Sequence, residues 1–335
     1  MINDGSEKFE KTFFADSMGY LGFPDEQIVV EDNLKLNLVH LTAVPSWVTT
    51  RREALLEIER FKKMIQVQPR LKLVTNQKEL LKAVADKKIA VILGMQNMPD
   101  DIGVFESAVS MLKNAGISVI APCRDKQNRF GSGCLNTDIG LTREGKCFLN
   151  DCGENGVIVN IAGCGHKMAG DIISRLKTGV KFNLMISHTG CYSLYHHLRN
   201  LPDDVLVGVA ELKGIIGIST INYINDERDN GVYGFQNHMD RARVLCGEKS
   251  VCVGSGNAYV TRSPEEDMKQ FKRTHLTMDS DKTLGVRFPI NPLPIMGPQM
   301  MDILCKFSFP HLPNDVWEGV FGGNLLNFFK KALLP

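Results

Sequence analysis

Short apolar runs alternate with longer amphipathic stretches along most of this chain. The apolar runs are rich in β-branched residues and about four to eight residues long, which is typical of buried parallel strands. They are Thr12–Ala15, Leu36–Leu41, Ile89–Leu93, Ser118–Ala121, Val157–Ile161, Phe182–Ser187, Ile215–Ser219 and Val251–Gly254. The stretches between them predict helices over 46–67, 103–115, 141–154, 166–178, 202–213 and 235–247, with a shorter strand–helix insert over 71–86.

Strands that alternate with helices indicate βαβ units and a parallel sheet. Eight of them predict a closed (β/α)₈ barrel of the TIM type, in one domain over residues 1–335. An open doubly wound sheet is the alternative. It is disfavoured because Gly254-Ser255-Gly256 comes late and lacks the third glycine of a dinucleotide-binding turn. A charged and Pro-rich segment at about 257–310 predicts a long loop over the barrel mouth, and 314–332 predicts C-terminal helices.

Composition narrows the class of protein further. The chain has 335 residues, 43% hydrophobic and 23% charged, which is typical of a soluble globular protein. With 39 basic and 38 acidic residues, neither nucleic acid nor an anionic membrane is an expected partner. No run of about 18 apolar residues predicts a membrane span. The nine cysteines form no Cys-x-x-Cys pair and no signal-peptide core is seen, so reduced thiols and a cytoplasmic location are expected.

The carboxyl ends of the strands are where a barrel of this type carries its chemistry. The side chains expected there include Met18, Tyr20, Gln96, Asn97, Cys123, Arg124, Cys164, His188 and Asn257. A two-zinc hydrolase needs several His and carboxylate ligands at this place. These positions supply one histidine and no carboxylate.

One segment carries a recognisable motif. Ser187-His188 is followed by the run Arg199-Asn200-Leu201-Pro202-Asp203-Asp204. This order resembles the membrane (renal) dipeptidase family of zinc peptidases, in which a Ser-His pair ends a barrel strand and an Arg-Asn-x-Pro-Asp-Asp run follows. Gly94-Met95-Gln96-Asn97 and the run 127–134 are similar to segments of a bacterial branch of that family. The resemblance covers roughly residues 12–332. It implies an amidohydrolase-like, metallo-dependent-hydrolase barrel, dipeptide hydrolysis at two zinc ions, and a homodimer.

The departures from that family pattern concern its metal ligands. The opening His-x-Asp motif aligns with Met18-Gly19-Tyr20, and the metal-bridging Glu aligns with Gln96, as it does in the bacterial branch. The Asp-Leu-Ser-His segment reads Asn160-Ile161-Ala162-Gly163, and the late Gly-Thr-Asp motif reads Gly254-Ser255-Gly256. One remaining histidine cannot hold two zinc ions. No metal site and no cofactor are therefore expected, although the family implies zinc.

Other residues suggest what could replace the metal. The resemblance makes Arg199, with Asn200 beside it, the site for a substrate carboxylate, and it places Arg124 in a substrate-facing position. Two arginines at one mouth favour a small anionic molecule, although Arg124 could instead be a solvent-facing loop residue. Gln96 and Tyr20 are further candidates for substrate binding.

A thiol nucleophile is the second possibility. Cys164 and His188 end adjacent predicted strands, about 4.8 Å apart in a sheet, so a Cys–His pair could provide an activated thiolate. The alternative is that Cys164 is a small buried hydrophobe. Asn97 or Asn257 could supply an amide that stabilises an oxyanion.

Three hypotheses follow from the sequence. The protein is a metal-independent enzyme that acts on a small carboxylate-bearing peptide or amino-acid derivative, a catalytically inactive homologue that binds a ligand or partner protein, or a dipeptidase with a non-standard metal site. Loss of turnover on replacing Cys164 or His188 distinguishes the first from the second. Bound metal distinguishes the third.

Overall fold

The computed structural model describes residues 12–21, 30, 34–99, 101–102, 108–135, 137–226, 232–276, 279–292, 296–307, 309 and 312–335. None of the helices among these residues is both long enough and apolar enough to cross a membrane. The part of the predicted helix 103–115 before residue 108 lies outside the described residues.

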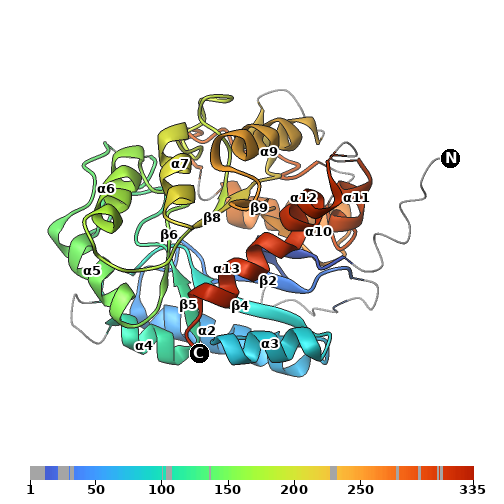
Figure 1. Ribbon diagram of the computed structural model, residues 1–335, viewed down its shortest axis with the longest axis horizontal. Helices are drawn as coiled ribbons and strands as arrows, with labels where there is room; N and C mark the ends of the chain where they lie inside the picture. Colours follow the sequence, from blue (N-terminus) through green and yellow to red (C-terminus); the bar gives the residue numbers. More distant parts are fainter. Residues whose placement is uncertain are drawn as a thin grey trace.

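A ring of parallel strands forms the centre of the molecule (Figure 1). Its eight strands are, in chain order, β1 (Ala15–Tyr20), β2 (Leu38–Val44), β4 (Ile89–Met95), β5 (Ile117–Ile120), β6 (Ile158–Asn160), β7 (Leu184–Thr189), β8 (Ile215–Ile218) and β9 (Val251–Val253). Each pairs in parallel with the next. Strand β10 (Asn257–Ala258) follows β9 after three intervening residues. It pairs with β1 through Gly19 and Asn257, which joins the end of the sheet to its first strand. The predicted (β/α)₈ barrel is confirmed.

Helices cover the outside of this ring (Figure 1). They are α2 (Arg51–Val67), α4 (Ala108–Ala115), α5 (Arg143–Glu154), α6 (His166–Lys177), α7 (Asp203–Glu211), α8 (Asn222–Asn225) and α9 (Tyr233–Cys246). The predicted insert is present as β3 (Leu71–Leu73), which pairs with β4, and α3 (Gln77–Ala85). Thr50 and Thr142 cap α2 and α5, since their side chains accept a bond from the backbone three residues on.

The amino-terminal end of the barrel is closed by the C-terminal helix. Helix α12 (Asn314–Glu318) continues through a π-helical turn (Gly319–Gly323) into α13 (Asn324–Ala332). From α13, Leu325, Phe328 and Phe329 pack in one cluster with inward residues of the strands, such as Leu38 and Ile92. The predicted C-terminal helices are confirmed. Between α12 and α13 the helical pitch changes over Gly319–Gly323.

The first strand is where the prediction was wrong. We predicted Thr12–Ala15, but β1 runs from Ala15 to Tyr20. Its residues Asp16 and Ser17 are fully buried, and most of their hydrogen-bond partners lie far away in sequence. Asp16 accepts bonds from Ser255 N at 2.9 Å and from the Tyr259 hydroxyl at 2.7 Å. The Ser17 hydroxyl bonds across the barrel interior to the carbonyls of Ser187, at 2.7 Å, and Val253, at 3.0 Å.

The segment at about 257–310 is more regular than the long loop that we predicted. It contains α10 (Pro264–Phe271), a π-helical turn (Lys272–Leu276) and α11 (Met300–Phe307). A capping box starts α10, in which Ser263 and Glu266 bond to each other's backbone N–H groups. Eleven of the described cavity-lining residues come from this segment after β10, so these helices and their connections cover the barrel mouth.

Candidate functional site

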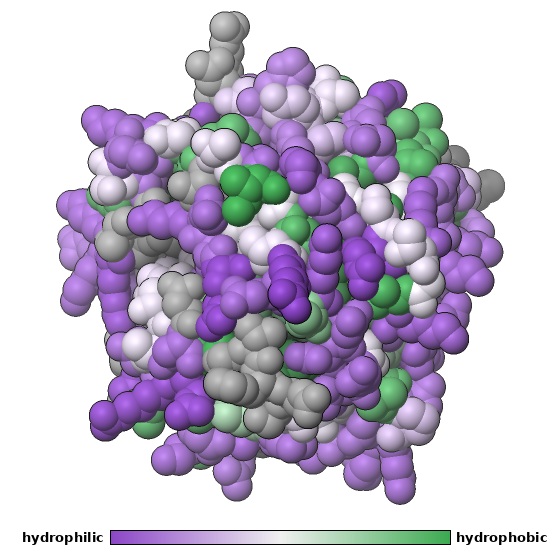
Figure 2. All heavy atoms as spheres, turned by 90° about the vertical axis from the view of Figure 1, so that its left-hand side faces the viewer, coloured by the Kyte–Doolittle hydropathy of each residue, from purple (hydrophilic) through white to green (hydrophobic). Residues whose placement is uncertain are grey.

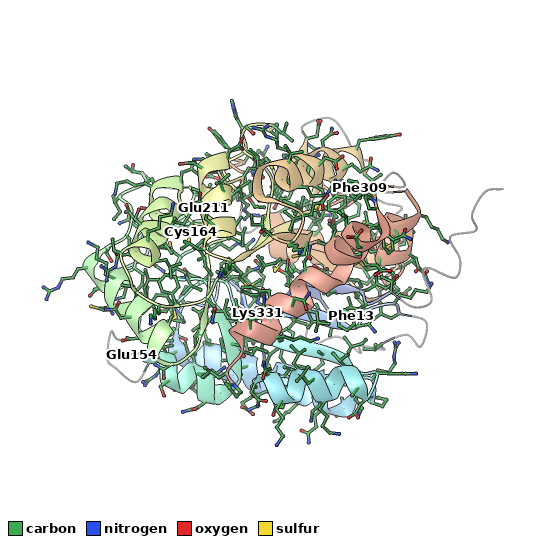
Figure 3. The ribbon with its side chains drawn as sticks, in the orientation of Figure 1. Phe13, Glu154, Cys164, Glu211, Phe309 and Lys331 are labelled. Carbon is green, nitrogen blue, oxygen red and sulfur yellow. The ribbon has the colours of Figure 1, made fainter. Side chains whose placement is uncertain are left out.

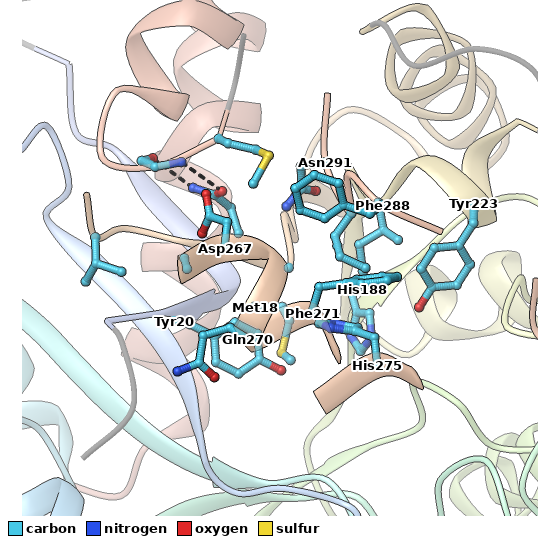
Figure 4. Close-up of a pocket in the computed structure, with 18 of the residues that line it drawn as sticks. Met18, Tyr20, His188, Tyr223, Asp267, Gln270, Phe271, His275, Phe288 and Asn291 are labelled. Atoms are coloured by element: carbon cyan, nitrogen blue, oxygen red, sulfur yellow. Dashed lines mark hydrogen bonds between the residues drawn. The ribbon is translucent and has the colours of Figure 1, made fainter. Parts of the chain in front are cut away.

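A cavity of about 110 Å³ lies between the carboxyl ends of the strands and the 260–297 segment. Residues on its wall from the strands, the loops that follow them and the short helix α8 are Met18, Tyr20, Trp47, Gln96, Arg124, His188, Arg199, Ile221, Tyr223, Gly256, Asn257 and Ala258. The covering segment adds Val260, Arg262, Asp267, Gln270, Phe271, His275, Phe288, Ile290, Asn291, Met296 and Gly297. Figure 4 shows residues of the cover gathered around Met18 and His188.

A buried ion pair holds one of the two predicted arginines. Arg199 donates from Nε to Asp125 Oδ1 at 3.0 Å and from Nη2 to Oδ2 at 2.8 Å. Its Nη1 donates to the Tyr223 hydroxyl at 2.6 Å. Burial acts to raise the pKa of Asp125, but the neighbouring Arg199 and Arg124 guanidinium groups hold it below its ordinary value. Burial likewise acts to lower the pKa of Arg199, and Asp125 raises it overall. Both groups are therefore charged.

The second arginine lacks such a partner. Arg124 Nε is 3.6 Å from Asp125 Oδ2, and this nitrogen makes no hydrogen bond to any residue that the structure describes. The Arg124 side chain is 6% exposed and lines the cavity. One carboxylate thus faces two guanidinium groups, which leaves a positive charge against the cavity. A buried cation without a full counter-charge is costly unless an anion joins it.

Hydrogen bonding fixes which nitrogen of His188 carries the proton. Asn160 Oδ1 accepts from the backbone N–H groups of Ser187 and Ala162, so its Nδ2 donates to Ser187 Oγ at 2.9 Å. We assign the Ser187 hydroxyl as the donor to His188 Nδ1, 3.0 Å away, because no other described residue offers this hydroxyl an acceptor. Burial, with Arg124 and Arg199 nearby, lowers the pKa of His188 well below its ordinary value. A neutral imidazole with an occupied Nδ1 carries its hydrogen on Nε2. His188 lines the cavity as a hydrogen-bond donor.

Tyr20 and Gln96 lie together on the cavity wall, as predicted candidates for ligand binding. Gln96 Nε2 is 3.4 Å from the Tyr20 hydroxyl and 3.6 Å from Met18 Sδ. The Thr42 hydroxyl lies 3.5 Å from the same sulfur. Burial raises the pKa of Tyr20, so its hydroxyl stays neutral, and the side chains of Gln96 and Thr42 bond to it.

Three other predicted residues do not line the cavity. Cys164, just before α6 (Figure 3), donates its thiol to the Cys123 carbonyl at 3.2 Å, and burial raises its pKa well above the ordinary value. A buried neutral thiol bonded in this way is not an activated nucleophile, and the expected Cys164–His188 pair is not formed. Asn97 accepts a bond from Asn128 at 3.0 Å. Asn200 stabilises the loop after β7, since its Oδ1 accepts from Gly190 N at 2.8 Å and its Nδ2 donates to Ile224 O at 2.6 Å.

Several residues that line or flank the cavity were missed from the sequence. Asp125 gives no sign of being a buried counter-ion, although it adopts a left-handed φ of 60° that Asp tolerates. Tyr223 lies in the four-residue helix α8, which is too short to show a periodic pattern. Phe271, His275 and Phe288 come from the segment read as a loop, and their contact depends on how that segment folds.

A model of the membrane dipeptidase family, peptidase family M19, matches residues 28–279, well over half of the chain. The chain belongs to the membrane dipeptidase family. Membrane dipeptidases and amidohydrolases also appear among similar structures. The amidohydrolase from Pseudomonas aeruginosa is 20% identical, with a TM-score of 0.78 over 98% of each chain. A metallo peptidase from Rhodobacter sphaeroides, liganded with a phosphinate mimic of the dipeptide L-Ala-D-Ala, is 14% identical, with a TM-score of 0.74 over 96% of this chain and 100% of the other. The TM-scores show a common fold.

A curated relative adds sequence similarity only. An uncharacterized protein in the PQQ-III 3′ region of Acinetobacter calcoaceticus is 26% identical over 170 residues. These cover 47% of this membrane dipeptidase homologue and 50% of the relative, so the match spans about half of the relative's length.

The membrane dipeptidase fold raises the question of whether this site suits two zinc ions. Within the described part of the chain, no three His, Cys, Asp or Glu side chains come together as ligands. At the ligand positions that the family resemblance predicts, Met18 supplies a thioether and Gln96 an amide, and the two are in contact. Zinc prefers thiolate, imidazole and carboxylate. These residues do not fit the two-zinc centre of a membrane dipeptidase.

Proposed function

We propose that this membrane dipeptidase homologue acts, without a two-zinc centre, on a small peptide or amino-acid derivative that bears a carboxylate. The observation that carries the proposal is the positive charge of Arg124 and Arg199 against the cavity, which Asp125 compensates only in part. A guanidinium group binds a carboxylate through two parallel hydrogen bonds. A bound carboxylate would complete the charge balance that the protein leaves open.

The roles of the residues follow from their chemistry. Arg124 takes the carboxylate, and Arg199 strengthens the local potential while Asp125 and Tyr223 hold it in place. His188 presents Nε2–H to the cavity, where it can donate to a carbonyl oxygen and stabilise negative charge that develops on it. Tyr20 and Gln96 flank the ligand.

A ligand-binding protein without turnover is the second candidate. It is favoured because no Cys, Ser or Thr is among the described residues that line the cavity. Turnover would then require water, or a proton transfer within the ligand, rather than a covalent intermediate. A cytoplasmic location and a homodimer remain predictions from sequence and family resemblance.

The test begins with protein purified without chelator, whose transition metals are counted per chain. Hydrolysis of a library of dipeptides and N-acyl amino acids is then measured before and after chelation. We expect less than one metal ion per ten chains, and any turnover should survive chelation and disappear in His188→Ala. His196→Ala, at an exposed histidine, is the control.

The outcomes separate the hypotheses. Turnover that is lost on chelation and restored by zinc would overturn the proposal in favour of a dipeptidase with a non-standard site. Carboxylate-dependent binding without turnover would establish the second candidate. A protein that neither binds nor converts any carboxylate in the library contradicts both.

A further inference from the structure

We infer that the ligand is an N-blocked carboxylate with an aromatic or similar apolar end, rather than a dipeptide with a free amino group. This inference rests on the proposed function, because it takes the carboxylate as the group that Arg124 binds. It adds what the remainder of the ligand must be. Three features of the cavity carry it: the charge of its walls, the side chains of its cover, and its size.

Among the described residues, the cavity wall offers an ammonium group no carboxylate without a cationic partner. Of the described residues that line it, Asp267 is the only carboxylate, and it faces Arg262 at 3.6 Å. Asp125, behind the wall, already takes two bonds from Arg199. Arg124, Arg199 and Arg262 supply three guanidinium groups, whereas Asp125 and Asp267 supply two carboxylates, so the surroundings carry a net positive charge. A free dipeptide would place its ammonium among these cations without an acidic partner.

The neutral groups at the head of the cavity are also donors. His188 presents Nε2–H, and Tyr20 retains its hydroxyl hydrogen because burial raises its pKa. Donors of this kind bind carbonyl and carboxylate oxygens. An amide-linked acyl group offers a carbonyl oxygen and carries no charge at its nitrogen. An N-acyl amino acid therefore matches the donors and avoids the repulsion.

The cover supplies an apolar surface opposite these donors (Figure 4). Phe271 and Phe288 meet edge to face, with ring centroids 5.5 Å apart. His275 stacks on Phe271 at 5.6 Å, and burial, with Arg199 and Arg124 nearby, lowers its pKa to about 3, so it is neutral. Ile290 and Met296 extend this surface. Aromatic walls of this kind recognise a ring through stacking and apolar contact.

The size of the cavity limits the ligand to a small molecule. Its volume is about 110 Å³, smaller than an engineered cavity of about 150 Å³ that holds one benzene molecule. The enclosed space therefore holds at most a single ring, and the remainder of the ligand occupies the part of the cavity that opens to solvent. At the rim, Trp47 is 46% exposed, so a longer ligand would extend past it to solvent.

A matched pair of probes tests the inference. N-acetyl-phenylalanine and glycyl-phenylalanine, both racemic, differ only in whether the acyl methyl group carries an ammonium. Their affinities are measured by titration calorimetry at pH 7, with N-acetyl-phenylalaninamide and N-acetylglycine as the probes without carboxylate and without ring. We expect N-acetyl-phenylalanine to bind at least tenfold more tightly than each of the other three.

Raising the pH provides an internal check. An α-amino group loses its proton at about pH 8. Glycyl-phenylalanine should therefore gain affinity between pH 7 and pH 9, whereas N-acetyl-phenylalanine should not. Phe288→Ala should weaken N-acetyl-phenylalanine at least tenfold more than it weakens N-acetylglycine. Phe271→Leu, a smaller change, repeats this comparison if the first variant is unstable.

The outcomes distinguish failure of this inference from failure of the proposed carboxylate site. If glycyl-phenylalanine binds as tightly as N-acetyl-phenylalanine while the amide does not bind, the inference is overturned and the proposed carboxylate site stands. If the amide binds as well as its parent acid, the carboxylate site itself fails. If none of the four probes binds, the inference is overturned, and the wider carboxylate library decides whether the proposed function survives.

Discussion

Two arginine–carboxylate pairs in this protein share one geometry but differ in burial, and this contrast allows a controlled prediction. Arg199 and Asp125 bond at 3.0 and 2.8 Å, and their side chains are 4% and 9% exposed. Arg129 and Glu144 bond at 3.1 and 2.7 Å, and their side chains are 32% and 42% exposed. Asp125→Asn and Glu144→Gln each remove one negative charge and keep the side-chain shape. Asn also tolerates the left-handed backbone at position 125.

Burial decides the size of the two effects. Removing Asp125 leaves Arg199 and Arg124 inside the protein without a counter-charge, and breaking a buried pair in this way costs about 3–5 kcal/mol. With an unfolding entropy of about 2.1 cal/mol/K per residue over the whole chain, that loss lowers the unfolding midpoint by about 4–7 °C. Glu144→Gln breaks a pair that solvent already screens, and its midpoint should stay close to that of the unchanged protein.

Thermal unfolding of the three proteins, followed by circular dichroism at pH 7.5 and again in 0.5 M NaCl, is the assay. Added salt should reduce the effect of Glu144→Gln and leave most of the effect of Asp125→Asn, because buried charges are less screened. Equal midpoints for the two variants would refute the reasoning, since they would show that the buried pair adds no more than an exposed one.

Three further predictions concern stability and chemistry. The pKa values of the buried His40 and His197 are lowered to about 4, mainly by burial, whereas unfolded histidines protonate near pH 6.5. The protein should therefore keep its full stability above pH 6.5 and lose about 2 kcal/mol per histidine by pH 5; urea midpoints unchanged from pH 7.5 to 5 would contradict this. A Cβ on Gly94 would lie 2.2 Å from His40 Nε2, whereas one on the helical Gly170 meets nothing within 4 Å. Gly94→Ala should cost about 1–3 kcal/mol in urea unfolding, and Gly170→Ala should gain about 0.5–1 kcal/mol; the opposite order would argue against the tight barrel interior. Cys164→Ala should keep the affinity for N-acetyl-phenylalanine within twofold of that of the unchanged protein, because the thiol bonds to the Cys123 carbonyl away from the cavity. A loss of binding or turnover would show instead that the thiol takes part in the functional site.

The barrel could be predicted from the sequence because its signal is local. Seven of the eight predicted strand ranges overlap most of the observed strand, since each combines an apolar run with a flanking amphipathic helix. The first strand could not be placed this way. Asp16 and Ser17 interrupt the apolar run, and apart from the bond that Met18 N donates to Asp16, the partners of their side chains lie more than 150 positions later. Helix α10 was missed because its charged sequence resembles that of a solvated loop.

The site was predictable only in part, for a similar reason. Tyr20, Gln96, Arg124 and His188 follow or end strands, and Arg199 carries a motif, so their convergence on one cavity could be expected from the fold class. The placement of Cys164 depends on the direction of one thiol, which the sequence does not encode locally. The partners that define the electrostatics, above all Asp125, become visible only when loops after different strands are brought together.

The closure of the barrel also sets an order for its assembly during synthesis. Asp16 and Ser17 leave the ribosome early, but their partners include Val253, Ser255 and Tyr259. Helix α13, which closes the amino-terminal end of the barrel, is synthesised later still. Until those residues emerge, the carboxylate and hydroxyl of the first strand lack their long-range partners, and the inner face of the ring stays open to water. Long-range closure of this kind is slow and leaves apolar surface accessible on the way. We therefore expect the apolar inner face of the nascent chain to be prone to association until the last helix arrives.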